Sequence, residues 1–132
     1  TLARDPHGLW YVNDSFFHLA LWGYNSIYAV SKNGPIWTQT MFVNATPQTY
    51  FSENTASHVT IDECGRSWLS VYNFGIVIYD EEGKFIGNFS LINNGIFDAI
   101  FVDNYVMYLS DNLQGRIIRL DPNITCSSDI FF

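Results

Sequence analysis

A short pattern that returns three times constrains the fold of this chain more than any other feature. In each copy an aspartate-led turn precedes an aromatic strand, a second strand and a tight polar turn. The copies begin at Asp5, Asp62 and Asp103. Units of about 20 to 50 residues that cannot bury their own apolar faces have to stack against one another. The repeat therefore predicts an all-β chain built from stacked sheets.

The spacing of the pattern predicts how the units are organised. The second strands are expected to begin near Ile27, Ile76 and Ile117. The leading aspartate precedes this strand by 14 positions in the second and third units and by 22 in the first. We therefore expect the first unit to carry an insertion around residues 15–23. Asp103 follows Asp62 by 41 positions, which is close to the length of a four-stranded propeller blade.

Apolar residues alternate or run in short blocks, and none repeats at helical spacing over three turns, so we expect strands and no helix. The predicted strands are 9–13, 26–31 and 35–42 in the first unit, 58–62, 67–72, 76–80 and 85–90 in the second, and 97–102, 106–110, 116–120 and 124–130 in the third. A polar linker is expected over 43–57. The prediction is a single β-propeller-like segment over 1–132, with units at about 1–56, 57–95 and 96–132. It has about three blades of antiparallel four-stranded sheets, the first irregular and the last truncated.

The repeats resemble the NHL-like β-propellers, in the six-bladed group that also contains gluconolactonase-type proteins. The likeness rests on the aspartate-led turns and on three stretches, which read GRSWL at 65–69, GIVIYDEEGK at 75–84 and GRIIRLD at 115–121. These motifs describe hairpins and blade packing, so the resemblance implies a shape and not a chemistry.

The number of units departs from that family. Propellers close a ring of about four to eight blades, whereas this chain supplies three, which leaves two apolar flanks with nothing against them. We expect further blades of a longer chain, or self-association, to cover these flanks. A dimer would close six blades, and a contact that does not close would continue into a fibre. The alternative is a compact three-sheet fold that is complete by itself.

The composition narrows the range of partners. Thirteen acidic residues against six basic ones give a net charge of −7, and the basic residues are scattered. Nucleic acids and anionic membranes require a clustered positive surface, so neither is an expected partner. No apolar run reaches the roughly 18 residues of a membrane span, so we expect no membrane insertion. No leader-like stretch is present either, and any secretory signal is expected to lie outside this chain.

Two cysteines, Cys64 and Cys126, allow one internal bridge. Adjacent blades would bring the first turn of the second unit close to the segment after the last turn of the third. Closing this loop of 62 residues would stabilise the fold by roughly 4 kcal/mol in the chain-entropy model. The alternative is two buried thiols that behave as small apolar residues.

Four Asn-X-Ser/Thr sequons point to an extracellular setting. They lie at Asn13, Asn44, Asn88 and Asn123. Asn88 is expected on an outermost strand and Asn123 in a turn, where an attached glycan would face water. Sequons together with a disulfide favour a secreted, N-glycosylated protein. Apart from N-linked glycans, we expect no cofactor.

No motif assigns a catalytic or metal site. The chain lacks Gly-X-Ser-X-Gly, has no local base beside Cys64 and has no phosphate-binding glycine loop. His58 and Asp98 are expected near the axis, where they would act as a base or metal ligand, but a structural pair is preferred. A metal site would draw its ligands from several units, and Glu53, Asp98 and Asn104 are candidates for them. No motif singles these residues out.

Aspartates recur at the predicted turns, at Asp62, Asp80, Asp103, Asp111 and Asp121. A turn carboxylate accepts backbone N–H bonds, so turn capping is preferred over the alternative of calcium binding.

Aromatic residues are the preferred candidates for binding or assembly. Trp22, Tyr24 and Trp37 would stack on sugar rings or fill a partner's pocket. Phe16 and Phe17 belong to the apolar insertion, which is expected to bury itself against a neighbouring copy or within its own chain. Trp10 and Trp68 are expected to occupy equivalent core positions.

The function that we expect is a non-enzymatic, extracellular structural or binding protein that self-associates through open blade faces, as a closed oligomer or a head-to-tail fibre. The alternatives are a metal-dependent hydrolase of the lactonase or esterase type and a carbohydrate- or peptide-binding module.

Overall fold

The computed structural model describes residues 6–21, 26–44, 56–72, 74–91, 96–102, 106–122 and 126. These residues form strands and turns, with no helix among them. The first sheet contains β1 (Pro6–Asn13), β2 (Phe16–Leu21), β3 (Ser26–Asn33) and β4 (Ile36–Asn44). The second contains β5 (Ala56–Ile61), β6 (Ser67–Val71), β7 (Gly75–Tyr79) and β8 (Phe85–Ser90). The third contains β9 (Ile96–Val102), β10 (Val106–Asp111) and β11 (Arg116–Leu120).

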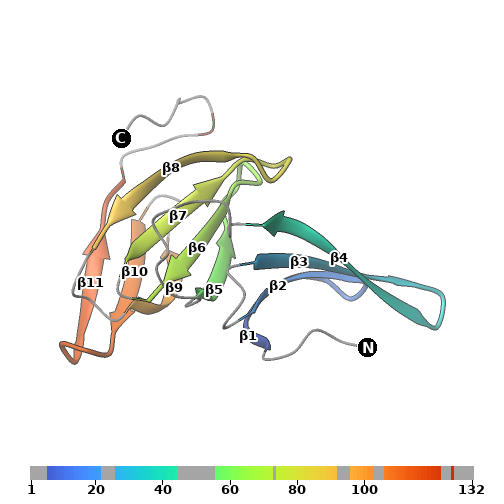
Figure 1. Ribbon diagram of the computed structural model, residues 1–132, viewed down its shortest axis with the longest axis horizontal. Coiled ribbons are helices and arrows are strands. Elements are labelled where there is room, and N and C mark those ends of the chain that lie inside the picture. Colours follow the sequence, from blue (N-terminus) through green and yellow to red (C-terminus); the bar gives the residue numbers. More distant parts are fainter. Residues whose placement is uncertain are drawn as a thin grey trace.

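Each sheet is an antiparallel meander in chain order, and the second sheet lies between the other two (Figure 1). The first strand of the second sheet, β5, contacts both β1 and β9, so the leading strands of the three sheets converge. The all-β prediction is therefore confirmed, with three propeller-like sheets of four, four and three strands. The strand expected over 124–130 lies outside the described residues.

The first sheet is more regular than the sequence predicted. Residues 16–21, expected within an insertion, form β2, which pairs with β1 on one side and β3 on the other. Aromatic and branched side chains fit a pleated surface with a neighbour on each face. Because the first sheet has its own second strand, the predicted equivalence of Trp10 and Trp68 is wrong. Trp10 lies on the first strand of its sheet and Trp68 on the second.

The repeat that the structure reveals runs through the second strands. Each carries a ring, a leucine and a small residue in succession, namely His18-Leu19-Ala20, Trp68-Leu69-Ser70 and Tyr108-Leu109-Ser110. The three leucines lie opposite matching positions on the third strands, which are Tyr28, Val77 and Ile118. The first three strands of each sheet are therefore equivalent, and equivalent residues on them point in equivalent directions.

Two hydrophobic cores lie between the sheets. The core between the first and second sheets includes Ala20, Ile27, Val43, Val59, Leu69, Val77 and Tyr79. The core between the second and third includes Trp68, Ile76, Ile78, Ala99, Met107 and Leu109. Side chains alternate between the two faces of a strand, and every residue of β6 and β7 is buried. The second sheet is thus covered on both faces, which explains its continuous apolar sequence.

Aspartates organise the turns. Asp62 accepts hydrogen bonds from the backbone N–H groups of Cys64 and Arg66, and from Nε of Arg66 and Nε1 of Trp68, over 2.6 to 3.0 Å. Asp80 accepts two backbone N–H bonds in the next hairpin, from Glu82 and Lys84. These contacts are those expected of turn capping. Asp103 lies outside the described residues.

Candidate functional site

The face of the first sheet that points away from the second sheet is apolar. We call it the first open face; its residues are Leu9, Tyr11, Phe17, Leu19, Tyr28, Val30, Trp37 and Met41. Leu19 and Val30 are its buried centre, and Phe17 and Tyr28 pack against them. The other four surround this centre and are directly exposed, at 50% for Leu9, 60% for Tyr11, 45% for Trp37 and 47% for Met41. Cross-strand pairing places Leu9 opposite Leu19, Tyr11 opposite Phe17 and Met41 opposite Tyr28.

Two of the aromatic residues singled out from the sequence meet on this face. The rings of Phe17 and Trp37 lie 5.8 Å apart, and Nζ of Lys32 lies 5.5 Å from the Trp37 ring. Phe16 takes the opposite face of β2, where its ring lies 5.1 Å from that of His18. Trp22 and Tyr24 lie outside the described residues. The adjacent Phe16 and Phe17 therefore do not form one cluster, because neighbouring side chains of a strand point to opposite faces.

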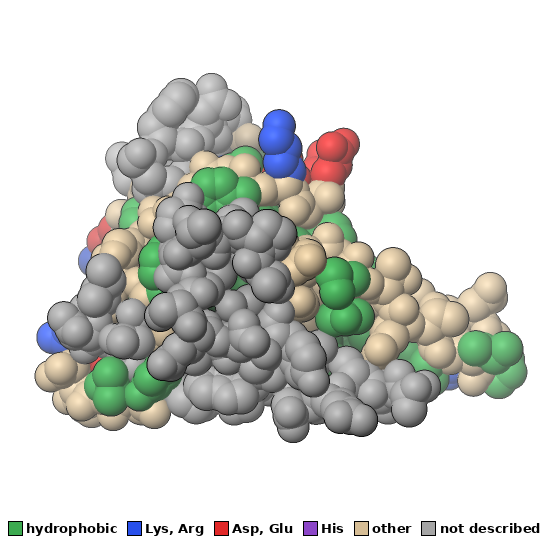
Figure 2. Space-filling view, in the orientation of Figure 1, with side chains coloured by type: hydrophobic (Ala, Val, Ile, Leu, Met, Phe, Trp, Pro, Cys, Tyr) green, Lys and Arg blue, Asp and Glu red, His purple; other side chains and the backbone are tan. Residues whose placement is uncertain are grey.

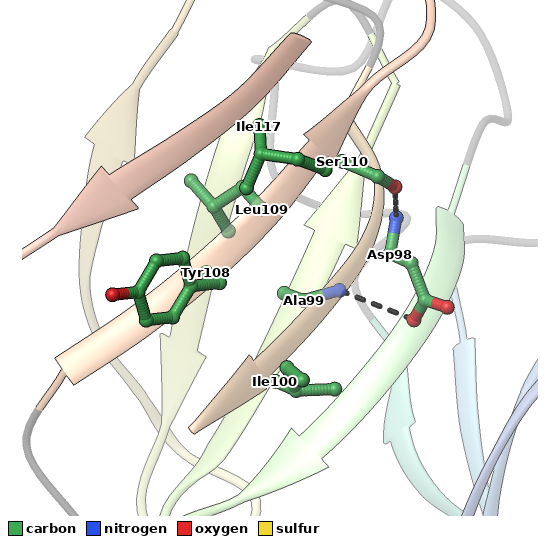
Figure 3. Close-up of a pocket in the computed structure, with 7 residues that line it drawn as sticks. All are labelled: Asp98, Ala99, Ile100, Tyr108, Leu109, Ser110 and Ile117. Carbon is green, nitrogen blue, oxygen red and sulfur yellow. Dashed lines mark hydrogen bonds between the residues drawn. The ribbon is translucent and has the colours of Figure 1, made fainter. Parts of the chain in front are cut away.

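The third sheet carries a second open face, on the side away from the second sheet. Its exposed apolar residues are Ile100, Tyr108 and Ile117, at 51%, 36% and 67%. A shallow cavity of about 180 Å³ lies on this face (Figure 3), lined by Asp98, Ala99, Ile100, Tyr108, Leu109, Ser110 and Ile117. The sequence repeat does not mark these apolar residues as a site. The alternation along β10 and β11 would have placed them on one face, but which face is covered depends on the neighbouring sheet.

Apolar side chains also gather at both ends of the molecule. Figure 2 shows them at the right, over the β3–β4 hairpin, and at the lower left, over the β10–β11 hairpin. Exposed residues at these two places include Ile36 at 63% and Leu113 at 53%. Among the described residues, the exposed large apolar side chains therefore belong to the first and third sheets and their hairpins.

His58 and Asp98 form the pair expected from the sequence. Nδ1 of His58 lies 3.1 Å from Oδ1 of Asp98 and joins β5 to β9, with 16% and 59% of the two side chains exposed. β1 approaches from the other side, where a Cβ on Gly8 would lie only 2.5 Å from Cα of His58. Ser110 accepts a hydrogen bond from the Asp98 backbone N–H over 3.0 Å. The geometry is that of a link between the leading strands of two sheets.

Cys64 and Cys126 form a disulfide, which ties the β5–β6 turn to the segment after β11. Glu63 lies beside them, and one ligand atom from each of the three residues falls within 4.8 Å of the others. The bridge removes both sulfur atoms as thiolate ligands, so the oxidised protein offers a metal ion only the carboxylate here. Glu53 and Asn104 lie outside the described residues.

Three of the four sequons lie on described strands. Asn13 and Asn44 are exposed at the ends of β1 and β4, and Asn88 is half-buried on β8, the outermost strand of its sheet. The Asn13 side chain accepts a hydrogen bond from the Ser15 backbone N–H over 2.9 Å. Asn123 lies outside the described residues.

A search of the described residues finds no helix that would span a membrane. No family model matches the chain, and no curated protein matches it. The fold is similar to the crystal structure of a protein of unknown function from Bacteroides caccae, with a TM-score of 0.54 and 13% sequence identity over 89% of this chain. The chain spans about half, 46%, of that protein's length. At this identity the likeness shows the fold alone.

Proposed function

We propose that this chain is a non-enzymatic structural or binding module of the NHL-like propeller type, and that its two open faces bind the blades of a second copy. The observation that carries this proposal is the repeat along the second strands. Leu69 and Leu109 each face the preceding sheet and are fully buried, and Trp68 is fully buried facing the following sheet.

The same repeat assigns a partner to each open face. Leu19 is the equivalent of Leu69, but no described sheet precedes it. Tyr108 is the equivalent of Trp68, but no described sheet follows it. Because equivalent positions of the second sheet are buried against a neighbour, the first and third sheets have the side-chain directions of internal blades. The proposed contact therefore joins the third sheet of one copy to the first sheet of the other.

The energetics favour this contact. Full burial of a leucine, isoleucine or aromatic side chain stabilises by about 1.5 to 3 kcal/mol. The partly exposed apolar side chains of the two open faces would supply this energy, and it works against an association cost of about 4 to 15 kcal/mol.

Symmetry then limits the assembly. A contact between unlike faces closes a ring if the rotation per copy allows it and otherwise continues as a fibre. Two copies of three sheets give six, which lies within the range of closed propellers.

An extracellular, N-glycosylated setting belongs to the same proposal. The disulfide and the exposed Asn13 and Asn44 support it, because disulfides persist in oxidising compartments and sequons are used on accessible surfaces. Carbohydrate or peptide binding is the second candidate, favoured by the 45% exposure of Trp37.

Sedimentation velocity tests the proposed association. The wild-type chain should sediment as a species larger than its 15.1 kDa monomer. Ile117→Lys, which places a charge in the second open face, should shift it to the monomer. Leu113→Lys is the matched control, because Leu113 is also an exposed aliphatic residue, at 53% against 67% for Ile117, but lies in the β10–β11 turn. A monomeric wild type, or equal effects of the two variants, would contradict the proposal.

A further inference from the structure

The disulfide between Cys64 and Cys126 lies within a group of metal-ligating side chains. Both cysteines and Glu63 place one ligand atom each within 4.8 Å of the other two. Cys126 and Glu63 are exposed and Cys64 is half-buried, so solvent reaches the group. In the oxidised protein the two sulfur atoms are bonded to each other. Reduction of the bridge makes two sulfur ligands available beside the carboxylate.

The distances fit a tetrahedral zinc ion. Bonds of about 2.3 Å to sulfur and about 2.1 Å to oxygen place neighbouring sulfur and oxygen ligands about 3.6 Å apart. Sγ of Cys126 and Oε1 of Glu63 already lie 3.6 Å apart. Two sulfur ligands of the same ion lie about 3.8 Å apart. The Cα atoms of Cys64 and Cys126 are 5.1 Å apart, so rotation of the side chains is sufficient to reach this separation.

A buried arginine stabilises Cys64 as a ligand. Nη2 of Arg66 donates to Sγ of Cys64 over 3.4 Å, and Nε of the same side chain donates to Asp62 over 2.6 Å. A guanidinium beside a cysteine favours the thiolate, which is the form that binds metal. Two thiolates and a carboxylate around a zinc ion leave one excess negative charge, which Arg66 offsets. Groups that orient metal ligands from outside in this way are a regular part of zinc sites.

We propose that the reduced protein binds a zinc ion through Cys64, Cys126 and Glu63. The ion then replaces the disulfide as the link between the β5–β6 turn and the segment after β11. Thiolates select zinc over magnesium and calcium, which prefer oxygen ligands. Three protein ligands leave the fourth position of the tetrahedron to water. The bridge and the ion exclude each other, so the site exists before the bridge forms and after it is reduced.

A phosphine reductant opens the site with a defined balance of atoms and electrons. The phosphine attacks the exposed Cys126 sulfur, the S–S bond breaks, and its electron pair leaves with Cys64 as a thiolate beside Arg66. Water then transfers its oxygen to phosphorus, which gives the phosphine oxide and releases Cys126 as a thiol. The phosphine loses two electrons and the disulfide gains two. Zinc binding then releases the protons of the two thiols.

Titration with cobalt(II), a spectroscopic substitute for zinc, tests the proposal. The phosphine-reduced wild type should develop a sulfur-to-cobalt charge-transfer band that saturates at a single equivalent, and zinc should abolish the band by displacing cobalt. The oxidised wild type should show no such band. Absence of the band in the reduced chain would overturn the proposal. So would a band of equal strength in the oxidised chain or in the double variant Cys64→Ser, Cys126→Ser.

Two carboxylate variants test the third ligand. In the reduced chain, Glu63→Gln should weaken zinc binding by at least about tenfold, measured by competition with a chromophoric chelator, because the amide carries no charge. Glu82→Gln is the matched control and should leave binding unchanged, since Glu82 is an exposed glutamate of the β7–β8 turn, outside the group of ligands.

This pair of variants also separates the folded site from an unfolded chain, which would bind zinc through its cysteines alone and would not distinguish the two glutamates. Equal zinc affinities of the two variants would overturn the proposed ligand set. Zinc binding by the reduced chain should persist in Ile117→Lys, so this proposal and the proposed association can fail separately.

Discussion

His18 is a buried histidine in an aromatic setting. Its ring lies 5.1 Å from that of Phe16 and 5.0 Å from that of Phe42. Nδ1 of His18 has no hydrogen-bond partner among the described residues. Trp68 takes the equivalent place in the second sheet and satisfies its N–H through Asp62. The imidazole thus fills the position of an apolar ring, and burial lowers its pKa from the ordinary value of 6.5.

Acid should therefore destabilise the chain through His18. The folded state keeps this histidine neutral, whereas the unfolded chain binds a proton below about pH 6.5. The free energy of unfolding therefore decreases as the pH is lowered through this range. No further unfolding free energy is lost once the pH is below the lowered pKa of His18 in the folded state. Urea unfolding at about pH 7.5 and about pH 5.5 measures it. His18→Phe keeps a ring and should show a smaller loss between these two conditions; a loss equal to that of the wild type would contradict this assignment.

The sequence predicts the limits of three strands of the second sheet correctly. The predicted ranges 67–72, 76–80 and 85–90 agree with β6, β7 and β8 to within one residue at each end. Polar turns bound these strands, and β6 and β7 are buried on both faces. The turn residues and the apolar runs therefore predict the same strand limits. The sequence repeat does not indicate β2, because the aromatic residues of β1 match those of β6 although β1 is the equivalent of β5. Under that match, Phe16 and Phe17 fall in an insertion.

Gly75 sets the start of β7 by steric necessity. Its φ is 136°, and a Cβ there would lie only 2.0 Å from the Phe89 carbonyl oxygen of the neighbouring β8. Gly34, in the β3–β4 turn, also has positive φ, at 62°, but a Cβ there would meet nothing within 4 Å. A side chain at Gly34 would therefore cause backbone strain alone, whereas one at Gly75 would cause strain and a clash.

Gly75→Ala should therefore cost more than Gly34→Ala. Gly34→Ala should lower the free energy of unfolding by about 1 kcal/mol, the cost of a left-handed residue with a side chain. Gly75→Ala adds a backbone clash within a sheet, and we expect a loss of about 3 kcal/mol or more. Urea denaturation of the two variants compares them directly. Similar losses would show that β8 moves aside at little cost.

At the scale of the molecule, the three sheets form an open arc. The second sheet is covered on both faces, whereas the first and third carry the two open faces. The disulfide joins the second sheet's first turn to the segment after the third sheet, across 62 positions of sequence. It therefore restrains the third sheet against the second, independently of any contact between copies.

Removal of the disulfide should lower the stability of the whole arc. The double variant Cys64→Ser, Cys126→Ser should lose up to roughly 4 kcal/mol of unfolding free energy, because the unfolded chain gains the freedom of a long loop. Urea unfolding with and without a reducing agent measures the loss. The reducing agent should destabilise the wild type and leave the double variant unchanged. An unaffected wild type would contradict the expected contribution of the bridge.

The sequence by itself determined the local features of this protein: strands rather than helices, aspartate-led turns, and the bounds of three strands of the second sheet. Side-chain alternation and turn chemistry act over a few residues, so they can be read from the chain. The tertiary structure alone decided which strands correspond, that Phe17 and not Phe16 shares a face with Trp37, and which faces of the first and third sheets are left exposed. These depend on how sheets far apart in the sequence pack, and the local pattern does not contain that information.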